Sequence, residues 1–189
     1  MISHSVPWFG RERRAGADRG RGWSVFAEMG GRSGAGVALF LSTFVNKVDR
    51  KGRVSVPATF RAAVAGQSFA GIVVFPGINY AALEASGIDH IEDMSSRVDA
   101  LPEFSEEREA ISAIFADVQQ LSFDSEGRIV LPPELCEHAG IVLEGSAAFV
   151  GNGRTFQIWE PERFARHQQE RRSRARGLTL PPRAEGGFR

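Results

Sequence analysis

The sequence predicts an α+β domain, rich in β-strands, that is built from two similar halves related by a pseudo-twofold axis. Three observations predict this class. The pattern Asp-x-x-Gly-Arg at residues 49–53 returns at residues 124–128, which is 75 residues later. A proline follows each copy at the same distance, and a short helical segment with two apolar strands follows each proline. A fixed-period repeat decides architecture, and two copies favour halves that complete each other over a solenoid.

Each half is expected to contain a strand, the repeated loop, a second strand, a short helix, a third strand, a turn and a fourth strand. The helices are placed by their ends, since Pro57 and Gly66 bracket the first and Pro133 and Gly140 bracket the second. Proline suits the first turn of a helix, where an N–H group has no partner, and glycine suits the position past its end.

The last two strands of each half predict a β-hairpin. Apolar runs at residues 72–75 and 147–150 predict the third strands, and residues 80–83 and 155–159 predict the fourth. Glycine and asparagine lie between the two strands of each half, and both residues tolerate the positive φ angles of tight hairpin turns.

Residues 85–119 differ from both halves and predict a helical connector. Apolar residues at 88, 91, 94 and 98 have the spacing of one helix, and Ser105 is a suitable N-cap for a second. The acidic residues of the segment are Asp89, Glu92, Asp93, Asp99, Glu103, Glu106, Glu107 and Glu109. Two helices that cover one face of the β-structure are expected, and a surface for self-association is an alternative that can coexist with this cover.

With these residues in view, each half resembles a DNA-binding unit of the SpoVT-AbrB type, which is a swapped-hairpin β-barrel. Two units in tandem resemble the MraZ family of bacterial transcriptional regulators, which has Asp-x-x-x-Arg in each half. Both signatures are intact, as Asp49 with Arg53 and Asp124 with Arg128, and residues 153–160 resemble the end of the family's second unit. The resemblance implies a pseudo-twofold swapped-hairpin β-barrel from two tandem repeats, with helices between and after them.

The repeat and the resemblance divide the chain into five segments. Residues 1–36 are a basic leader, residues 39–84 the first SpoVT-AbrB-like unit and residues 85–119 the connector. Residues 120–163 are the second unit, and residues 164–189 are a basic helix end and a flexible tail. The arginines of this last region and its approach are Arg163, Arg166, Arg171, Arg172, Arg174 and Arg176.

The leader is rich in glycine and arginine and shows no hydrophobic periodicity, which is typical of disorder. A signal peptide is disfavoured, because the leader is too long and the apolar run at residues 36–45 leads straight into the first repeat. A start codon assigned too early is a further hypothesis, with initiation near Met29 or Val37. The intact mass of the protein from its native source would test it.

The repeated loop combines three residue types with different predicted roles. Gly52 and Gly127 allow a sharp turn with positive φ. Asp49 and Asp124 accept hydrogen bonds from loop amides and brace the loop, and they are poor DNA contacts because a carboxylate repels phosphate. Two roles are open for the loop arginines: pairing with these aspartates across the pseudo-twofold, or a forked contact with a phosphate or a guanine edge.

The first loop is more basic than the second, and this difference assigns the main DNA contact to it. Its candidate contacts are Arg50, Lys51 and Arg53, with Lys47 before the loop and Arg61 after it. In the second loop Glu126 lies beside Arg128 and lowers the local positive potential. Arg128 is therefore a weaker candidate.

The family resemblance implies a function and its partners. It implies a sequence-specific DNA-binding regulator that represses the promoter of its own division and cell-wall gene cluster. The partners are double-stranded DNA with repeated promoter boxes and further copies of the chain in a ring-like homo-oligomer. Such linked sites raise affinity by ~10²–10⁴ without new contacts. The implied location is the cytoplasm, in association with the nucleoid.

Two other functions stay open. An oligomeric scaffold whose loops bind a protein partner would lack the steep salt dependence that counterion release gives to DNA binding. An AbrB-like antitoxin would be encoded beside a toxin gene and would carry a C-terminal toxin-binding segment. An enzyme is not expected: the only lysines, Lys47 and Lys51, do not follow a glycine, so the chain has no phosphate-binding Gly-Lys loop.

Composition narrows the classes further. The formal net charge is zero, so nucleic-acid binding requires a local basic patch. Cys136 is the only cysteine, which leaves no intrachain disulfide and fits a reducing cytoplasm. The longest apolar run is far shorter than the ~20 residues that span a bilayer, so no membrane partner is expected.

No metal, cofactor or small-molecule substrate is expected either. The histidines are His4, His90, His138 and His167, and they lie far apart in the sequence without a Cys-x-x-Cys or His-x-x-x-His motif. Cys136 is expected to be a small buried apolar residue. Phe156 and Trp159 are expected in the core rather than on a base-stacking surface.

Overall fold

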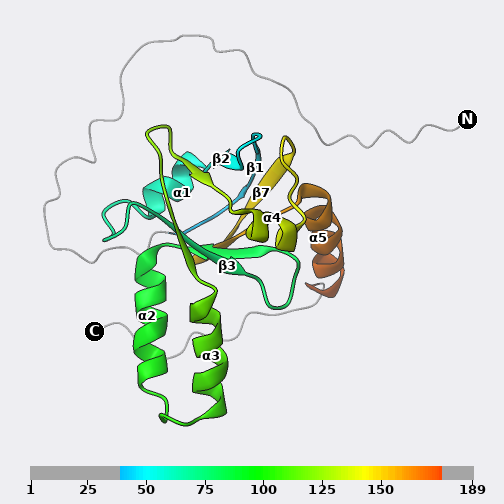
Figure 1. Ribbon diagram of the computed structural model, residues 1–189. Helices are drawn as coiled ribbons and strands as arrows, with labels where there is room; N and C mark the ends of the chain where they lie inside the picture. Colours follow the sequence, from blue (N-terminus) through cyan, green and yellow to red (C-terminus); the bar gives the residue numbers. More distant parts are fainter. Residues whose placement is uncertain (1–38, 176–189) are drawn as a thin grey trace, which may run out of the picture. The chain divides into compact units, whose positions relative to one another are not determined.

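The computed structural model describes residues 39–175. The predicted leader at residues 1–36 and the part of the predicted tail after residue 175 lie outside the described residues, so the hypotheses on disorder and on the start site are not tested. Within the described residues the chain forms a six-stranded antiparallel sheet, a separate pair of strands and five helices (Figure 1).

The six-stranded sheet has the strand order β1-β7-β8-β4-β3-β5. Its strands are β1 (Thr43–Lys47), β3 (Gly71–Pro76), β4 (Leu83–Ser86), β5 (Gln119–Ser122), β7 (Ser146–Asn152) and β8 (Thr155–Trp159). The separate pair consists of β2 (Arg53–Ser55) and β6 (Arg128–Val130). Each half therefore has the four strands that the sequence predicts.

One strand begins later than the sequence predicts. Residues 80–83 were expected to form the fourth strand of the first half, but β4 begins only at Leu83. The reason is a turn: the N–H of Gly77 bonds to the carbonyl of Ala82, and the N–H of Ala82 bonds to the carbonyl of Tyr80, both at 2.8 Å. These bonds hold the backbone of residues 77–82 in a turn, so pairing with β3 starts only at Leu83.

The two halves exchange strands. β1 pairs with β7 and β5 pairs with β3, so the first strand of each half lies beside the third strand of the other. The registers are equivalent, since Asn46 pairs with Ala147 and Leu121 pairs with Ile72 at positions 75 residues apart. The pairs β2–β6 and β4–β8 also join the halves. Each half therefore supplies strands that complete the pairing of the other, in equivalent registers.

The sheet is not closed into a barrel. β1 and β5 are its two outer strands, and they do not pair with each other. The α+β class, with an antiparallel sheet and several helices, is confirmed. The swapped-hairpin β-barrel that the resemblance implies is not confirmed and stays a prediction.

Both halves contribute aromatic rings to one core. Phe60 is fully buried, and its ring centre lies 5.2 Å from that of Phe40 and 4.9 Å from that of Phe156. Phe149, also fully buried, lies 6.2 Å from Phe156. Removing one such side chain from water stabilises the fold by about 1.5–3 kcal/mol. Phe156 and Trp159 are buried, so the prediction that they are core residues is confirmed.

Two short helices occupy equivalent positions after β2 and β6. They are α1 (Ala58–Ala63) and α4 (Pro133–Ala139). α4 ends at Gly140 with a left-handed φ of 68°, which a glycine adopts without steric cost. Cys136 on α4 is buried as predicted, and burial together with nearby Glu134 raises the pKa of its thiol. It therefore packs as a small apolar side chain.

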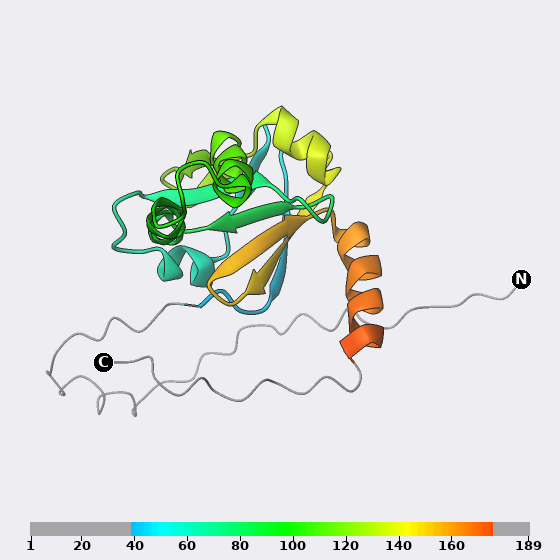
Figure 2. The ribbon, with the colours of Figure 1, turned by 90° about the horizontal axis from the view of Figure 1, so that it is seen from below.

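The connector contains α2 (Ile88–Asp99) and α3 (Glu106–Ala116), which lie side by side and extend away from the sheet (Figures 1 and 2). Ser105 caps α3 as predicted, because its Oγ accepts a hydrogen bond from the N–H of Arg108 at 3.2 Å. The expectation that both helices cover one face of the β-structure is wrong. α3 buries no residue and α2 buries only Val98, so their apolar stripes are only partly withdrawn from water.

Arg108 fixes the connector in this arrangement. Its Nη1 donates to the carbonyls of Val98, Asp99 and Leu101 at 3.2–3.5 Å, and its Nη2 pairs with the Asp99 carboxylate at 3.2 Å. These acceptors include the carbonyl groups that the end of α2 leaves without intrahelical partners. One side chain of α3 therefore bonds to the end of α2 and ties the two helices of the connector together.

The last helix, α5 (Pro161–Ala175), packs on the end of β8 through aromatic rings. The Trp159 ring lies 4.8 Å from that of His167, stacked at 21°, and 6.1 Å from that of Phe164. Arg163 donates from Nη1 to the carbonyl of Ala139 at 3.3 Å, which ties α5 to the end of α4. Figure 2 shows α5 beside the sheet, on the opposite side from α2.

Phe60→Ala tests the shared core against a matched control. The substitution should lower the free energy of unfolding by about 3–5 kcal/mol, because it empties a fully buried site that both halves enclose. Phe104 is 94% exposed, so Phe104→Ala should change the stability by less than about 0.5 kcal/mol. Urea denaturation followed by circular dichroism measures both values, and equal losses in the two variants would refute the assignment of the core.

Candidate nucleic-acid interface

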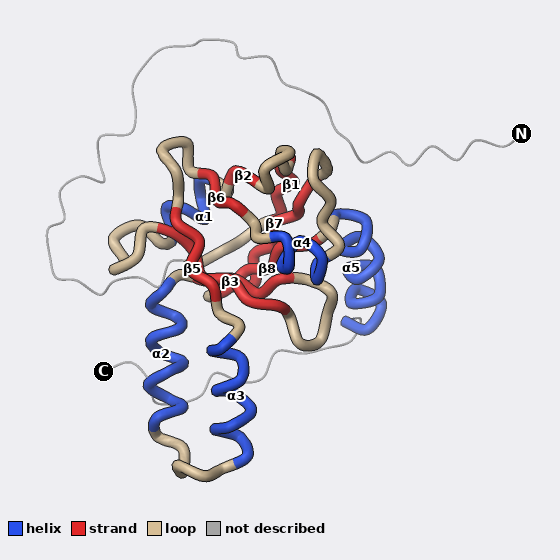
Figure 3. Tube along the Cα trace, viewed as in Figure 1, coloured by secondary structure: helices blue, strands red, loops and turns tan. Residues whose placement is uncertain are grey.

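Two equivalent loops flank the β2–β6 pair, and we call them loop 1 (residues 48–52) and loop 2 (residues 123–127). Loop 1 leads into Arg53, which pairs with Val130, and loop 2 leads into Arg128, which pairs with Ser55. Because the pair is antiparallel, the loops lie at its opposite ends. Figure 3 shows both loops along the same edge of the fold, next to β2 and β6.

Loop 1 is organised by the carboxylate of Asp49. Its Oδ1 accepts hydrogen bonds from the N–H groups of Lys51 and Arg53 at 2.8 and 3.0 Å. Its Oδ2 accepts one from Nε of Arg53 at 2.6 Å and pairs with Nη2 at the same distance. Gly52 completes the turn with a φ of 75°. A Cβ at this glycine would lie 2.8 Å from the carbonyl oxygen of Leu131, so both conformation and space require glycine here.

Loop 2 repeats this geometry with one addition. Oδ1 of Asp124 accepts hydrogen bonds from the N–H groups of Glu126 and Arg128, both at 2.9 Å, and Oδ2 accepts one from Nε of Arg128 at 2.7 Å. Nη1 of Arg128 also pairs with the Glu126 carboxylate at 2.7 Å. Gly127 has a φ of 72°. The Arg128 guanidinium is therefore shared between two carboxylates of its own loop.

These hydrogen bonds favour the ionised form of both aspartates. Partial desolvation of Asp49 opposes ionisation, but the N–H groups of Arg53 and Lys51 and the Arg53 guanidinium outweigh it, so the pKa of Asp49 lies below its ordinary value of 3.8. The N–H and guanidinium of Arg128 lower the pKa of Asp124 below 3.8 in the same way. In turn, hydrogen bonding to Asp124 raises the pKa of Arg128 above its ordinary value.

Each loop is also bonded to the opposite half of the chain. The carbonyl of Gly52 accepts a hydrogen bond from the N–H of Leu131 at 2.9 Å, and the carbonyl of Gly127 accepts one from the N–H of Val56 at 3.1 Å. The two donors stand directly before a proline that precedes a helix. Leu131 comes before Pro132 and α4, and Val56 comes before Pro57 and α1. The two loops are therefore held in one rigid frame.

The arginines pair with the loop aspartates in a way that the sequence did not predict. Arg53 pairs with Asp49 and Arg128 pairs with Asp124, each within its own loop at a spacing of four residues. Pairing across the pseudo-twofold is therefore wrong. The cause is local: an aspartate that accepts hydrogen bonds from the loop amides already faces the arginine at the loop's end.

Three exposed cations at or beside loop 1 lie free of such pairing among the described residues. Lys47, Arg50 and Lys51 are exposed, and among residues 39–175 none of their side chains has an ion pair or a hydrogen bond. Loop 1 thus presents charges without partners on a braced turn. Loop 2 has no equivalent of Arg50 or Lys51, since Ser125 and Glu126 stand there.

Arg61 lies elsewhere than the sequence suggested. It was grouped with loop 1 because it follows that loop in the chain, but its side chain crosses to loop 2. A Cβ on Gly127 would collide with Nη1 and Cζ of Arg61, which shows how closely the guanidinium covers that glycine. The reason is the exchange of strands, which places α1 of the first half beside the loop of the second. Chain order alone gives no signal of this contact.

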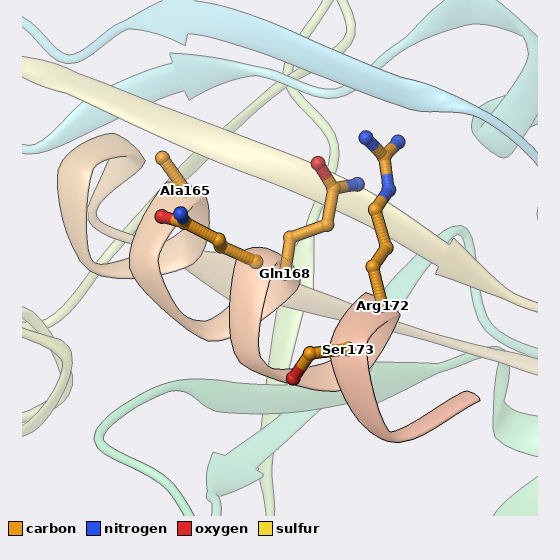
Figure 4. A pocket seen from close by; sticks show the side chains of 5 residues that line it. Ala165, Gln168, Arg172 and Ser173 are labelled. Atoms are coloured by element: carbon orange, nitrogen blue, oxygen red, sulfur yellow. The ribbon is translucent and has the colours of Figure 1, made fainter. Parts of the chain in front are cut away.

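Other candidate sites are few in the part of the chain that the structure describes. No group of three or more potential metal-binding side chains was found there, and no helix there is long and apolar enough to cross a membrane. A hollow of about 440 Å³ lies along α5, with Ala165, Gln168, Arg172 and Ser173 on its wall (Figure 4). All its described lining residues come from this one helix.

Comparisons with known proteins show the family to which the chain belongs. A family model described as "MraZ protein, putative antitoxin-like" matches residues 114–178, which include loop 2. The protein named transcriptional regulator MraZ from Rickettsia canadensis (strain McKiel) is 48% identical over 130 residues, which are 68% of this chain and 86% of that protein. The chain belongs to the MraZ family.

Other MraZ relatives agree. The transcriptional regulator MraZ of Rickettsia akari (strain Hartford) is 47% identical over 130 residues, covering 68% of this chain and 86% of its own length. That of Rickettsia bellii (strain OSU 85-389) is 48% identical over 128 residues, covering 67% and 84%. The predicted family is confirmed, and the names of these MraZ proteins support the broad class of transcription regulator.

The lowered pKa values of the loop aspartates predict a pH dependence. A carboxyl with a depressed pKa contributes stability that is present above pH 3.8 and is lost as the pH falls through the folded-state pKa. Asp49→Asn and Asp124→Asn cannot ionise, so they lack this contribution at every pH. The gap in urea midpoint between wild type and each variant should be constant near neutral pH and should shrink below pH 3.8. A gap that widens in acid would contradict the assignment.

Proposed function

We propose that the protein is a transcriptional regulator that binds double-stranded DNA sequence-specifically, with loop 1 as its main contact. One observation carries the proposal: Arg50 and Lys51 are exposed without carboxylate partners on a turn that Asp49 and Gly52 hold rigid. Because the turn already fixes the backbone, only the rotamer freedom of these side chains is lost when they meet a phosphate. Lys47, exposed at the end of β1, extends the same basic surface.

Arg53 is proposed as the base-reading residue of loop 1, although it pairs with Asp49. Both side chains of the pair are more than one third exposed. Exposed ion pairs contribute only about 0–1 kcal/mol, so a stronger partner can displace the aspartate. A guanidinium forked onto a guanine edge is worth about 1–3 kcal/mol. Arg128 is proposed as a weaker contact, because DNA would have to displace two carboxylates from it.

Self-association gives this small basic surface sufficient affinity. Phosphate contacts weaken steeply with salt, and one loop offers only a few of them. A ring-like homo-oligomer that presents one loop 1 per subunit to repeated promoter boxes gains avidity of ~10²–10⁴. Resemblance to the MraZ family supplies the proposed target, which is the promoter of the protein's own division and cell-wall gene cluster. The proposed action there is repression, and the proposed location is the nucleoid.

An antitoxin is the second candidate, and the description of the matched family model favours it. This function requires a toxin encoded beside the gene and a complex between the two proteins. Co-expression with each neighbouring gene product followed by affinity purification separates the candidates. A stable stoichiometric complex, without salt-sensitive DNA binding, would favour the antitoxin.

DNA binding by loop 1 can be measured without disturbing the loop. Arg50→Ala and Lys51→Ala remove exposed side chains that make no hydrogen bond or ion pair among residues 39–175, so the fold should be unchanged. Each should weaken binding to the DNA upstream of the protein's own gene and should make the salt dependence shallower by about one unit of slope per bound subunit. Fluorescence anisotropy across a salt series measures both effects.

Arg53→Ala should weaken binding by about tenfold or more, since a forked base contact is worth roughly 1–3 kcal/mol, and should reduce the preference over scrambled DNA. The matched control is Arg97→Ala, which removes another exposed arginine paired four residues away, with Asp93 on α2. The control should bind as the wild type does. Unchanged binding by all three loop variants would exclude loop 1 as the contact.

The oligomer is tested by mass. Multi-angle light scattering at micromolar concentration should give a multiple of the 20.6 kDa chain mass. The same sample at the salt concentration used for DNA binding should keep this mass, because the proposed avidity needs the assembled form. A monomer under these conditions would remove the basis for avidity and count against the proposed mode of binding.

A further inference from the structure

Arg61 carries a charge that nothing in the described residues compensates. Its side chain is only partly exposed, and its Nε is buried without a hydrogen-bond partner. Among residues 39–175 it has no ion pair and no hydrogen bond. Withdrawing a guanidinium from water is costly unless an acceptor replaces the lost solvent. The position therefore lacks an anionic partner.

The Asp124 carboxylate of loop 2 does not fill this role. Oδ1 of Asp124 is occupied by the N–H groups of Glu126 and Arg128, and Oδ2 is occupied by Nε of Arg128. Glu126, the other acid of loop 2, pairs with Arg128. The acids of loop 2 are thus committed to the loop's own arginine. Arg61, which arrives from the other half, keeps its full positive charge.

A hollow of about 290 Å³ opens beside Arg61. Loop 2 contributes Asp124, Ser125 and Gly127 to its wall, and residues 64–67, Phe69, Ala70 and Phe123 supply most of the rest. The Ser125 hydroxyl is a donor of the kind that contacts phosphate oxygens. An unpaired cation, a hydroxyl and open space at the edge of a loop suit a phosphate group, and the Asp124 carboxylate on the same wall is already paired with Arg128.

The pseudo-twofold shows that this arrangement is confined to one loop. The residue equivalent to Arg61, 75 positions later, is Cys136, which is buried and is not a cation. Loop 1 therefore has its own free cations and no arginine from the other half, whereas loop 2 lacks free cations and receives Arg61. Arg61 thus gives loop 2 one cation that does not come from its own half, although loop 1 remains the more basic of the two.

We propose that Arg61 is the phosphate-binding residue of loop 2, and that the hollow beside it seats a phosphate group of the DNA backbone. This inference rests on the proposed function and deepens it, because it gives each subunit a second backbone contact outside loop 1. The alternative role of Arg61 is packing alone, with its apolar stem covering Gly127. Phosphate binding depends on the positive charge of Arg61, whereas packing depends only on its stem.

Arg61→Met and Arg61→Lys test charge against packing. Methionine keeps the length of the stem without the charge, and lysine keeps the charge as a point. Arg61→Met should make the salt slope of DNA binding shallower by about one unit per bound subunit. The loss should be equal on specific and scrambled duplexes, because phosphate contacts carry no sequence information. Arg61→Lys should restore the slope. Binding by Arg61→Met with the slope of the wild type would overturn the proposal.

A measurement on the wild type guards against a variant that fails to fold. The buried Nε–H of Arg61 is shielded from solvent and should give a slowly exchanging side-chain resonance in ¹H–¹⁵N spectra, assigned by its absence from Arg61→Lys. Addition of a duplex should shift this resonance. A shift with inorganic phosphate but none with DNA would place a free anion in the seat and overturn the DNA contact.

The proposed function and the proposed role of Arg61 would be refuted by different results. If the wild type does not bind DNA at low salt, the proposed function falls, and with it the DNA contact of Arg61. If the wild type binds with steep salt dependence while Arg61→Met binds identically, only the role of Arg61 falls. Arg97→Met is the control for loss of a remote exposed arginine and should leave the slope unchanged.

Discussion

The pairing of β1 with β7 and of β5 with β3 is the interaction on which the rest of this structure depends. Backbone N–H and C=O groups must find partners when they are buried, and the first strand of each half finds them only in the other half. Neither half can assemble its sheet alone. The aromatic core, with Phe40 and Phe60 from one half and Phe149 and Phe156 from the other, forms only as a consequence of this exchange.

The same exchange shapes the candidate interface. It brings the N–H of Leu131 to loop 1 and that of Val56 to loop 2, so each loop is fixed by the half it does not belong to. It also carries α1, and Arg61 with it, over Gly127. Fusing two halves in one chain lets the two loops differ, which a dimer of identical halves could not do. Here one loop has free cations, and the arginine of the other is held by two carboxylates.

Much of this could be predicted from the sequence, because the repeat marks equivalent positions. The short helices, the third strands, the cap at Ser105 and the two glycine turns follow from local chemistry that acts within a few residues. The packing of the connector could not be predicted in this way. A 3–4 spacing of apolar residues shows that a helix has an apolar stripe, but it does not say whether a sheet or another helix covers it. The bonds of Arg108 to the end of α2 give no periodic signal.

Some features of the candidate site could be predicted from the sequence, and others could not. Asp49 and Gly52 have roles that depend on residues two to four positions away, and those roles are visible in the sequence. The contact of Arg61 with loop 2 joins residues 66 positions apart in the chain, and only the strand order brings them together. A repeat shows that two segments are alike but not which of them is neighbour to which.

Exchanged strands also set an order of events during synthesis. β1 ends at residue 47 and its partner β7 begins at residue 146, so the first strand leaves the ribosome long before it can pair. At about 5–20 residues per second the delay is roughly 5–20 seconds. During this time the apolar Phe44 and Val45 have no native neighbour strand, whereas the intervening α2 and α3 need only local contacts to form. The first strand of the nascent chain therefore stays without its native partner until the residues of β7 have been synthesised.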